Sequence, residues 1–230
     1  MRRNIAVILA GGIGSRAGEG LPKQLRALPD GGTVLQTCLD AFRACPLIDE
    51  ICVVMHPDYM SYVPEGICCI AGGKERWESS WNAIQYIANL LTDSPIHQFT
   101  NILLHDCARP FVSRRILTDV CQALETHDAV TVAVPATDTM YVVNGEGRME
   151  NGDWRLVDIP DRKTMFRAQT PQAFHLDVIR EAYEKMQVNR PMVNPTDDCG
   201  ILHRYMPEVP IYIVEGEESN RKLTFKEDFE

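Results

Sequence analysis

The sequence predicts an α/β fold with a mostly parallel sheet, helices on both faces and a protruding β-arm. First, short apolar runs without polar alternation recur along the 230 residues, as expected of strands that are covered on both sides. Second, segments with apolar residues at helical spacing lie between these runs, and such alternation is typical of a parallel sheet. Third, a group of turn signals near residue 145 interrupts the alternation. We therefore expect one domain, residues 1–230, that carries an arm at about 138–163.

The strands and helices follow from the apolar pattern. Six buried strands are expected, at residues 5–9, 51–55, 67–70, 102–104, 129–134 and 211–214. Four helices are expected, with apolar faces spanning residues 34–42, 77–91, 116–124 and 176–186. Ser113 stands where its hydroxyl can cap the third helix.

The expected arm is a β-hairpin. Turn signals occur at Asn144-Gly145 and Asn151-Gly152, and short β-prone pieces, residues 140–143 and 154–157, flank them. A two-stranded hairpin is marginally stable when it stands alone in water. The arm is therefore expected to pack on another copy of the chain, which predicts a homodimer.

Composition excludes several classes of partner. The formal net charge is -9 and the pI about 5.2, whereas proteins that bind nucleic acid are usually basic. No run approaches the roughly 20 apolar residues of a membrane span. The first apolar stretch, residues 5–10, is shorter than the core of a signal peptide, and the eight cysteines form no C-x-x-C pair. We expect a reduced, cytoplasmic protein with no nucleic-acid or membrane partner.

The loop after the first strand predicts a phosphate site. Gly11, Gly12 and Gly14 let the backbone approach a ligand closely, and successive free N–H groups there can form an anion-binding nest. Arg16 and Lys23 follow, so two cations lie beside the nest. The alternative is a tight glycine turn with two solvated cations.

The same loop partly matches a dinucleotide fingerprint, Gly-x-Gly-x-x-Ala at residues 12–17. That fingerprint opens directly into a helix, but helical periodicity here resumes only at Val34. The acid expected after the second strand is also absent, because Met55, His56 and Pro57 stand there. An NAD-dependent oxidoreductase is therefore disfavoured.

Two further polar clusters follow strands. Gly72 and Gly73 precede a helix that carries Ser79, and the start of that helix offers unpaired N–H donors for a ligand. Asp106 follows the fourth strand, where ligands bind in open α/β sheets, and its carboxylate suits Mg²⁺. Arg109 could pair with a phosphate or with Asp106, so a plain strand-end salt bridge remains an alternative. His105 is interpreted as structural.

Polar residues in the second half of the chain allow a second phosphate site. Thr139, Arg162, Thr196 and Lys222 have the hydroxyl and cationic groups that such a site needs. Taken one by one, residues of these kinds are more often plain surface residues than ligands of a phosphate. Thr196-Asp197 could also be a helix N-cap.

The order of these motifs carries a resemblance. The first half of the chain contains four motifs: Ala-Gly-Gly-x-Gly-Ser-Arg at 10–16, Pro-Lys-Gln at 22–24, Gly-Gly-x-x-Arg-x-x-Ser at 72–79 and His-Asp-x-Ala-Arg-Pro at 105–110. The second half contains three more: Asp-Thr-Met at 138–140, Ala-Gln-Thr-Pro-Gln-Ala-Phe at 168–174 and Thr-Asp-Asp at 196–198. In this order they resemble the cytidylyltransferase family that contains 2-C-methyl-D-erythritol 4-phosphate cytidylyltransferase and ribitol-5-phosphate cytidylyltransferase. The resemblance extends from about Ile5 to Phe229 and implies a Rossmann-like nucleotidyltransferase domain, a β-arm and a homodimer.

The resemblance also implies roles for individual residues. It assigns cytidine recognition to the glycine loops, at Ala10, Gly11, Gly12, Gly14, Gly73 and Ser79. It assigns catalysis to three cations that hold phosphates, Arg16, Lys23 and Lys222. It assigns binding of the polyol phosphate to Asp106, Arg109, Thr139, Arg162 and Thr196, together with Lys222. Arg162 would reach this site from the arm of a partner chain. Asp106 would also contact Mg²⁺ or another divalent cation.

The expected reaction joins CTP to a polyol phosphate and releases pyrophosphate. An oxygen of the substrate phosphate attacks the α-phosphorus of CTP directly, and such transfer depends on positioning and charge neutralisation. The acceptor that the sequence favours is 2-C-methyl-D-erythritol 4-phosphate, an isoprenoid precursor; ribitol 5-phosphate, which would yield CDP-ribitol for cell-surface polymers, is the alternative. A nucleotide-binding regulator without turnover is the alternative from another class.

Overall fold

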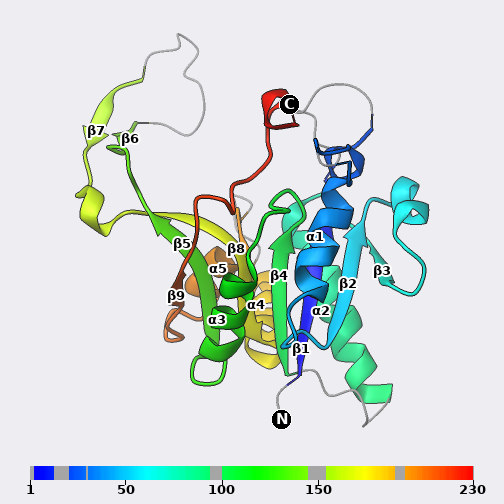
Figure 1. Ribbon diagram of the computed structural model, residues 1–230. Helices are drawn as coiled ribbons and strands as arrows, with labels where there is room; N and C mark the ends of the chain where they lie inside the picture. Colours follow the sequence, from blue (N-terminus) through cyan, green and yellow to red (C-terminus); the bar gives the residue numbers. More distant parts are fainter. Residues whose placement is uncertain are drawn as a thin grey trace.

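A seven-stranded sheet forms the centre of the protein (Figure 1). The computed structural model describes residues 3–12, 21–29, 31–93, 100–144, 154–189 and 195–229. The strands of this sheet are β1 (Asn4–Ala10), β2 (Glu50–Met55), β3 (Cys68–Ala71), β4 (Asn101–Asp106), β5 (Ala129–Pro135), β8 (Phe166–His175) and β9 (Tyr212–Glu215). Their order across the sheet is β3-β2-β1-β4-β8-β5-β9. All six strands expected from the sequence are present, and the mostly parallel sheet is confirmed.

The sequence did not predict β8, which lies between β4 and β5 and runs antiparallel to both. Its segment holds Gln169, Thr170 and Gln172 around Pro171, and a proline argues against a central strand. The polar side chains are nevertheless buried and hydrogen-bonded: Gln169 donates to the Glu217 carbonyl oxygen at 2.8 Å. The Thr170–Pro171 peptide bond is cis.

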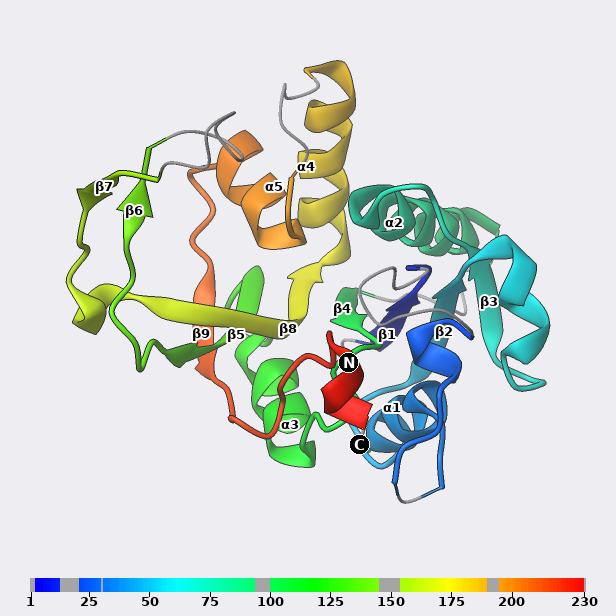
Figure 2. The same cartoon turned by 90° about the horizontal axis from the view of Figure 1, so that it is seen from above.

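Helices cover both faces of the sheet (Figure 2). They are α1 (Val34–Arg43), α2 (Arg76–Asp93), α3 (Arg114–Ala123), α4 (Leu176–Val188) and α5 (Asp198–Tyr205). The short 3₁₀ helices are η2 (Lys23–Leu25), η3 (Pro57–Tyr62), η4 (Arg162–Thr164) and η5 (Lys226–Phe229). One face packs against α1 and α3, and the other against α2, α4 and α5. The four expected helices are present, and α5 is an addition.

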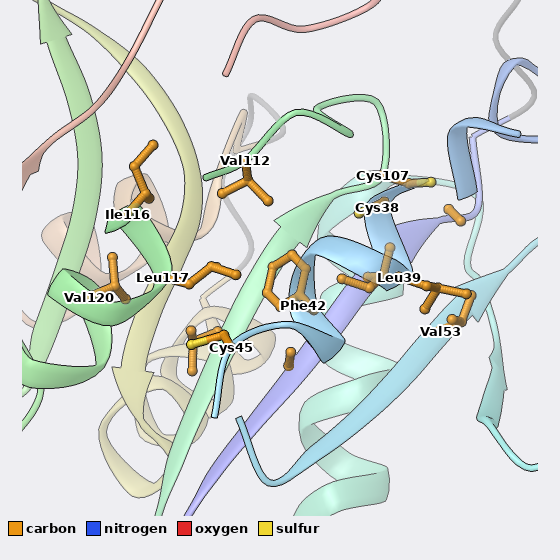
Figure 3. Close-up of a cluster of buried hydrophobic side chains, with 14 of the residues drawn as sticks. Cys38, Leu39, Phe42, Cys45, Val53, Cys107, Val112, Ile116, Leu117 and Val120 are labelled. Atoms are coloured by element: carbon orange, nitrogen blue, oxygen red, sulfur yellow. The ribbon is translucent and has the colours of Figure 1, made fainter. Parts of the chain in front are cut away.

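Successive side chains of β1 point alternately into the two core layers, one on each face of the sheet. Ala6 and Ile8 belong to the core layer under α1 and α3, whereas Ile5 and Val7 belong to the layer under α2 and α4. Figure 3 shows the first layer, in which Phe42 packs among side chains of α1, α3 and the sheet. The continuous apolar runs of the sequence are explained by this burial on both sides.

Polar residues fix where helices begin. The Ser113 hydroxyl accepts from the Ile116 amide at 3.2 Å, which confirms the predicted cap of α3. At α5 the cap is Asp197, whose carboxylate accepts from the Gly200 amide at 2.8 Å. Thr196, immediately before it, is exposed.

Beyond β5 the chain leaves the central sheet. Strands β6 (Val142–Val143) and β7 (Leu156–Asp158) pair antiparallel in a separate two-stranded sheet, which lies apart from the seven-stranded one (Figure 1). Residues 145–153 of the expected arm lie outside the described residues. Among the described helices, none has the length and apolar character needed to cross a membrane.

Candidate functional site

A cleft opens at the carboxyl ends of β1 and β4, the two neighbouring strands between which the strand order of the sheet reverses. The chain proceeds from β1 outward to β2 and β3 and then returns to place β4 on the other side of β1, with Leu9 opposite Asp106. Ligands of open α/β sheets bind at this kind of position, beyond the carboxyl ends of the strands. A cleft of about 360 Å³ opens there, lined by the loops after β1 and β3, the end of β4 and the C-terminal segment around Lys222.

Glycines bring the two loops of the cleft together. A side-chain carbon on Gly11 would lie 3.3 Å from the Ser79 hydroxyl oxygen and 3.6 Å from the Gly72 Cα atom. On Gly73 such a carbon would overlap the Cβ atom of Glu78. Close packing between the two loops therefore requires glycine at Gly73 and leaves little room for a side chain at Gly11.

Side chains of α2 hold the loop that leads into this helix. The Glu78 carboxylate accepts from the amides of Lys74 at 2.7 Å and Glu75 at 3.1 Å, and the Ser79 hydroxyl accepts from the Gly73 amide at 3.1 Å. These three donors lie before the first residue of α2, Arg76, so they are occupied by the protein itself.

Asp106 is held between two cations. Arg76 Nε donates to one carboxylate oxygen at 3.0 Å and Lys222 Nζ donates to the other at 2.7 Å. Burial alone would raise the pKa of Asp106, but the charges of Arg76 and Lys222 outweigh burial and hold this pKa far below its ordinary value. Asp106 is therefore an anion that can accept hydrogen bonds and ligate a cation.

Arg76 was not among the predicted site residues. Its other end donates to Asp198 at 2.8 Å, and the Asp198 side chain is 0% exposed. The Tyr183 hydroxyl donates to the second oxygen of Asp198 at 2.6 Å. Burial lowers the pKa of Arg76, but Asp198 and Asp106 together raise it above its ordinary value. Arg76 is a fixed cation that joins the cleft to the buried layer beneath α4 and α5.

His105 is linked to the backbone of Asp106 through the Thr170 hydroxyl. Its Nε2 atom lies 3.0 Å from the Arg109 carbonyl oxygen, which only accepts, so Nε2 carries the proton. The Thr170 hydroxyl then donates to Nδ1 at 3.0 Å and accepts from the Asp106 amide at 3.1 Å. Burial lowers the pKa of His105 to about 4, and this neutral ring is the form that the hydrogen bonds require. The structural interpretation of His105 agrees with these contacts.

In the described part of the chain, the hydrogen bonds of the Arg109 guanidinium go to backbone carbonyl oxygens, and not to the Asp106 carboxylate that one alternative paired with it. Its guanidinium donates to the carbonyl oxygens of Asn220 at 2.9 Å and Ala168 at 3.2 Å. The buried Asn220 in turn donates to the Thr170 carbonyl oxygen at 2.9 Å. Arg109 thereby ties β8 to the C-terminal segment that carries Lys222.

The structure gathers eight of the predicted residues at the cleft: Ala10, Gly11, Gly12, Lys23, Gly73, Ser79, Asp106 and Lys222. Four others do not line the cleft of a single chain: Arg109, Thr139, Arg162 and Thr196. Arg109 binds the backbone carbonyl oxygens described above, Thr139 is exposed beyond β5, Arg162 donates to the Thr137 carbonyl oxygen at 3.0 Å, and Thr196 precedes α5. Gly14 and Arg16 lie outside the described residues.

Comparisons with known proteins agree on one family. A family model described as IspD, 2-C-methyl-D-erythritol 4-phosphate cytidylyltransferase, matches residues 4–230. A relative of that name from Thermobifida fusca is 40% identical over 235 residues, which cover 98% of this chain and 90% of the relative. A bifunctional ribulose 5-phosphate reductase/CDP-ribitol pyrophosphorylase from Haemophilus influenzae is 35% identical over 96% of this chain, but only 46% of its own length is covered.

Solved structures are similar over nearly the whole chain. The 4-diphosphocytidyl-2C-methyl-D-erythritol synthase from Anaerococcus prevotii has a TM-score of 0.78 at 26% identity, with 99% of this chain and 93% of that chain covered. The 2-C-methyl-D-erythritol 4-phosphate cytidylyltransferase from Francisella tularensis has a TM-score of 0.77 at 27% identity, with 99% and 96% covered.

Proposed function

Because the chain belongs to the 2-C-methyl-D-erythritol 4-phosphate cytidylyltransferase family, a family of nucleotidyltransferases, we propose that its cleft transfers CMP from CTP to 2-C-methyl-D-erythritol 4-phosphate. The observation that carries the proposal is the placement of Lys23 and Lys222 in one cleft beside the glycine loops and Asp106. The products are the CDP-polyol and pyrophosphate.

Charge is the main support for a reaction between two phosphates. The protein as a whole has a net charge of -9. Among the described residues, however, the cleft has four cationic side chains, Lys23, Lys74, Arg76 and Lys222, against the carboxylates of Glu75 and Asp106. Cations that converge in a cleft concentrate anionic ligands even when the protein is acidic overall. The cleft can therefore offset the repulsion between CTP and a phosphorylated acceptor.

The proposed chemistry is a direct displacement. An oxygen of the acceptor phosphate forms a bond to the α-phosphorus of CTP, the bond from that phosphorus to the bridging oxygen breaks, and pyrophosphate leaves with the electron pair. The acceptor phosphate is already largely ionised near neutral pH, so no general base is needed. Lys23 is proposed to hold the triphosphate and Lys222 the acceptor phosphate, so that the reacting atoms are positioned and the developing charge is stabilised.

A divalent cation such as Mg²⁺ fits this cleft as a partner of the substrates. The described residues contain no group of three or more metal-ligating side chains. Asp106 supplies one carboxylate, and each of its oxygens accepts one hydrogen bond and keeps a further lone pair. Mg²⁺ is commonly bound through one or two carboxylates plus substrate phosphates and water. When bound, the ion would neutralise phosphate charge.

The second substrate site is proposed to be completed by a homodimer. Thr139 and Arg162 lie at the base of the arm, outside the cleft of their own chain. The two short strands of the arm expose apolar side chains, among them Val142, Leu156 and Val157, and exposed apolar groups of this kind mark association surfaces. Arg162 would then serve the partner's cleft, with Thr196 and Arg109 beside the acceptor phosphate. A Leu156→Lys variant that keeps the dimer mass in analytical ultracentrifugation would contradict this arrangement.

Pyrophosphate release tests the function directly. The purified protein is assayed with each of the four NTPs crossed against 2-C-methyl-D-erythritol 4-phosphate and ribitol 5-phosphate, with Mg²⁺ present. We expect turnover only with CTP, and with the methylerythritol acceptor. Turnover with ribitol 5-phosphate alone would assign the alternative acceptor, and CTP binding without turnover would assign a nucleotide-binding regulator.

The Lys23→Ala variant shows whether the cleft is responsible. Removing one donor that stabilises developing charge typically costs about 10²- to 10³-fold in rate. The matched control is Arg180→Gln, which removes an exposed cation on α4 that pairs with Glu184 at 3.5 Å. The control should retain wild-type turnover. Near-normal turnover of a folded Lys23→Ala variant would contradict the assignment.

A further inference from the structure

The ion network around Asp106 is asymmetric. Arg76 and Lys222 both line the cleft, but Arg76 also binds Asp198, whose side chain is 0% exposed. Lys222 bonds to Asp106 at 2.7 Å, and its side chain is 40% exposed. Arg76 is therefore held by two carboxylates and Lys222 by one, among the contacts of the described residues.

We propose that Arg76 is a positioning residue, which keeps Asp106 paired while Lys222 moves from Asp106 to the acceptor phosphate. The inference rests on the proposed function, because it supposes that Lys222 binds that phosphate. It concerns the arginine of the Gly-Gly-x-x-Arg-x-x-Ser motif at 72–79, to which neither the resemblance nor the comparisons give a role.

Arg76 matters because the Asp106 carboxylate loses one of its two cationic partners when Lys222 moves to the acceptor phosphate. Asp106 is only 13% exposed, and a buried carboxylate without a partner is costly. With Arg76 present, the Asp106 oxygen at 3.0 Å from Arg76 Nε remains paired after Lys222 leaves. Without Arg76, Lys222 would be the main counter-ion of Asp106, and its release to a substrate would be less favourable. Arg76 thus lowers the cost of moving Lys222 without touching the substrate itself.

The anchor behind Arg76 explains why Arg76 stays in place. Asp198 receives hydrogen bonds from Arg76 at 2.8 Å and from the Tyr183 hydroxyl at 2.6 Å, and its own amide donates to Gln172 at 2.9 Å. The planar guanidinium of Arg76 binds Asp106 through one nitrogen and Asp198 through another. A lysine has a single ammonium group and could not bind both carboxylates in this geometry. A direct contact between Arg76 and the triphosphate is the competing explanation, since Arg76 also lines the cleft.

The experiment compares two variants that remove Arg76. Arg76→Gln alone leaves Asp198 as an unpaired buried charge, so the double variant Arg76→Gln/Asp198→Asn removes both charges and protects the fold. Arg180→Gln serves as the matched control on the surface. Steady-state kinetics give KM for CTP and for 2-C-methyl-D-erythritol 4-phosphate separately, and calorimetry gives the Kd of CTP.

The expected result is a loss of about 10- to 100-fold in kcat/KM, the size of one hydrogen bond to a charged group. The loss should appear in KM for the acceptor, while the Kd of CTP changes by less than about 3-fold. In a Lys222→Ala background, Arg76→Gln should cost less than about 3-fold more, because both changes remove the same step.

The opposite outcomes overturn the inference. An equal loss of CTP affinity, or full multiplication of the two losses in the Lys222→Ala background, would show that Arg76 acts on the nucleotide directly. Wild-type kinetics in the double variant would show that Arg76 is dispensable. Failure of the proposed function looks different, because the wild-type protein itself would then show no cytidylyl transfer.

Discussion

Lowering the pH should destabilise the protein through His105. The folded chain holds this ring neutral with a pKa of about 4, because it is buried between the Arg109 carbonyl oxygen and the Thr170 hydroxyl. The ordinary pKa is 6.5. Between these values the unfolded chain binds the proton and the folded chain does not, so stability is present above pH 6.5 and is lost as pH falls toward 4. At about 1.4 kcal/mol per pKa unit, the loss reaches about 2 to 3 kcal/mol near pH 4.5.

Urea unfolding at a series of pH values between about 7 and 4.5 measures this loss. The comparison is with His105→Asn, which cannot be protonated, and with His203→Asn, which changes an exposed residue on α5. We expect the His105 variant to be less stable at pH 7 but to lose less stability on acidification, and the His203 variant to follow the wild type. Parallel pH curves for wild type and His105→Asn would refute the reasoning.

Three further substitutions test the cleft and its support. Gly73→Ala should destabilise the protein by about 1 to 3 kcal/mol, because its new carbon overlaps Glu78, whereas Gly12→Ala meets nothing within 4 Å and should change the free energy of unfolding by less than about 0.5 kcal/mol. Equal urea midpoints for the two alanine variants would contradict this. Tyr183→Phe removes the 2.6 Å hydrogen bond to the buried Asp198 and should cost about 1 to 3 kcal/mol in the same assay. An unchanged midpoint would show that this bond contributes nothing.

Much of the fold could be predicted from the sequence because burial on both faces leaves a strong apolar pattern. Six strands and four helices were found in this way, and the Ser113 cap was confirmed. Strand β8 could not be found, because its polar residues signal a surface loop until their partners are known. Gln169, for example, is bonded to the Glu217 carbonyl oxygen, 48 residues away in sequence. Partners so distant along the chain leave no local signal.

The candidate site was predictable where it depends on strand ends and glycines. Gly11 and Asp106, which follow the ends of β1 and β4, line one cleft, and Lys222, which only the resemblance pointed to, lines it with them. Arg76 stands in the motif at 72–79 but was given no role, since an arginine at the start of a helix is usually a solvated surface residue. Its importance comes from Asp198, 122 residues later, which the fold brings to 2.8 Å from it. Long-range ion pairs of this kind require the three-dimensional structure.

Calorimetric titration of CTP into the wild-type protein, and into Lys23→Ala and Gly73→Ala, tests most directly whether this cleft is the nucleotide site. The proposed function predicts one CTP bound per chain and at least about a 10-fold loss of CTP affinity in each variant relative to Arg180→Gln. Unchanged CTP affinity in both folded variants would place the nucleotide elsewhere and contradict the account.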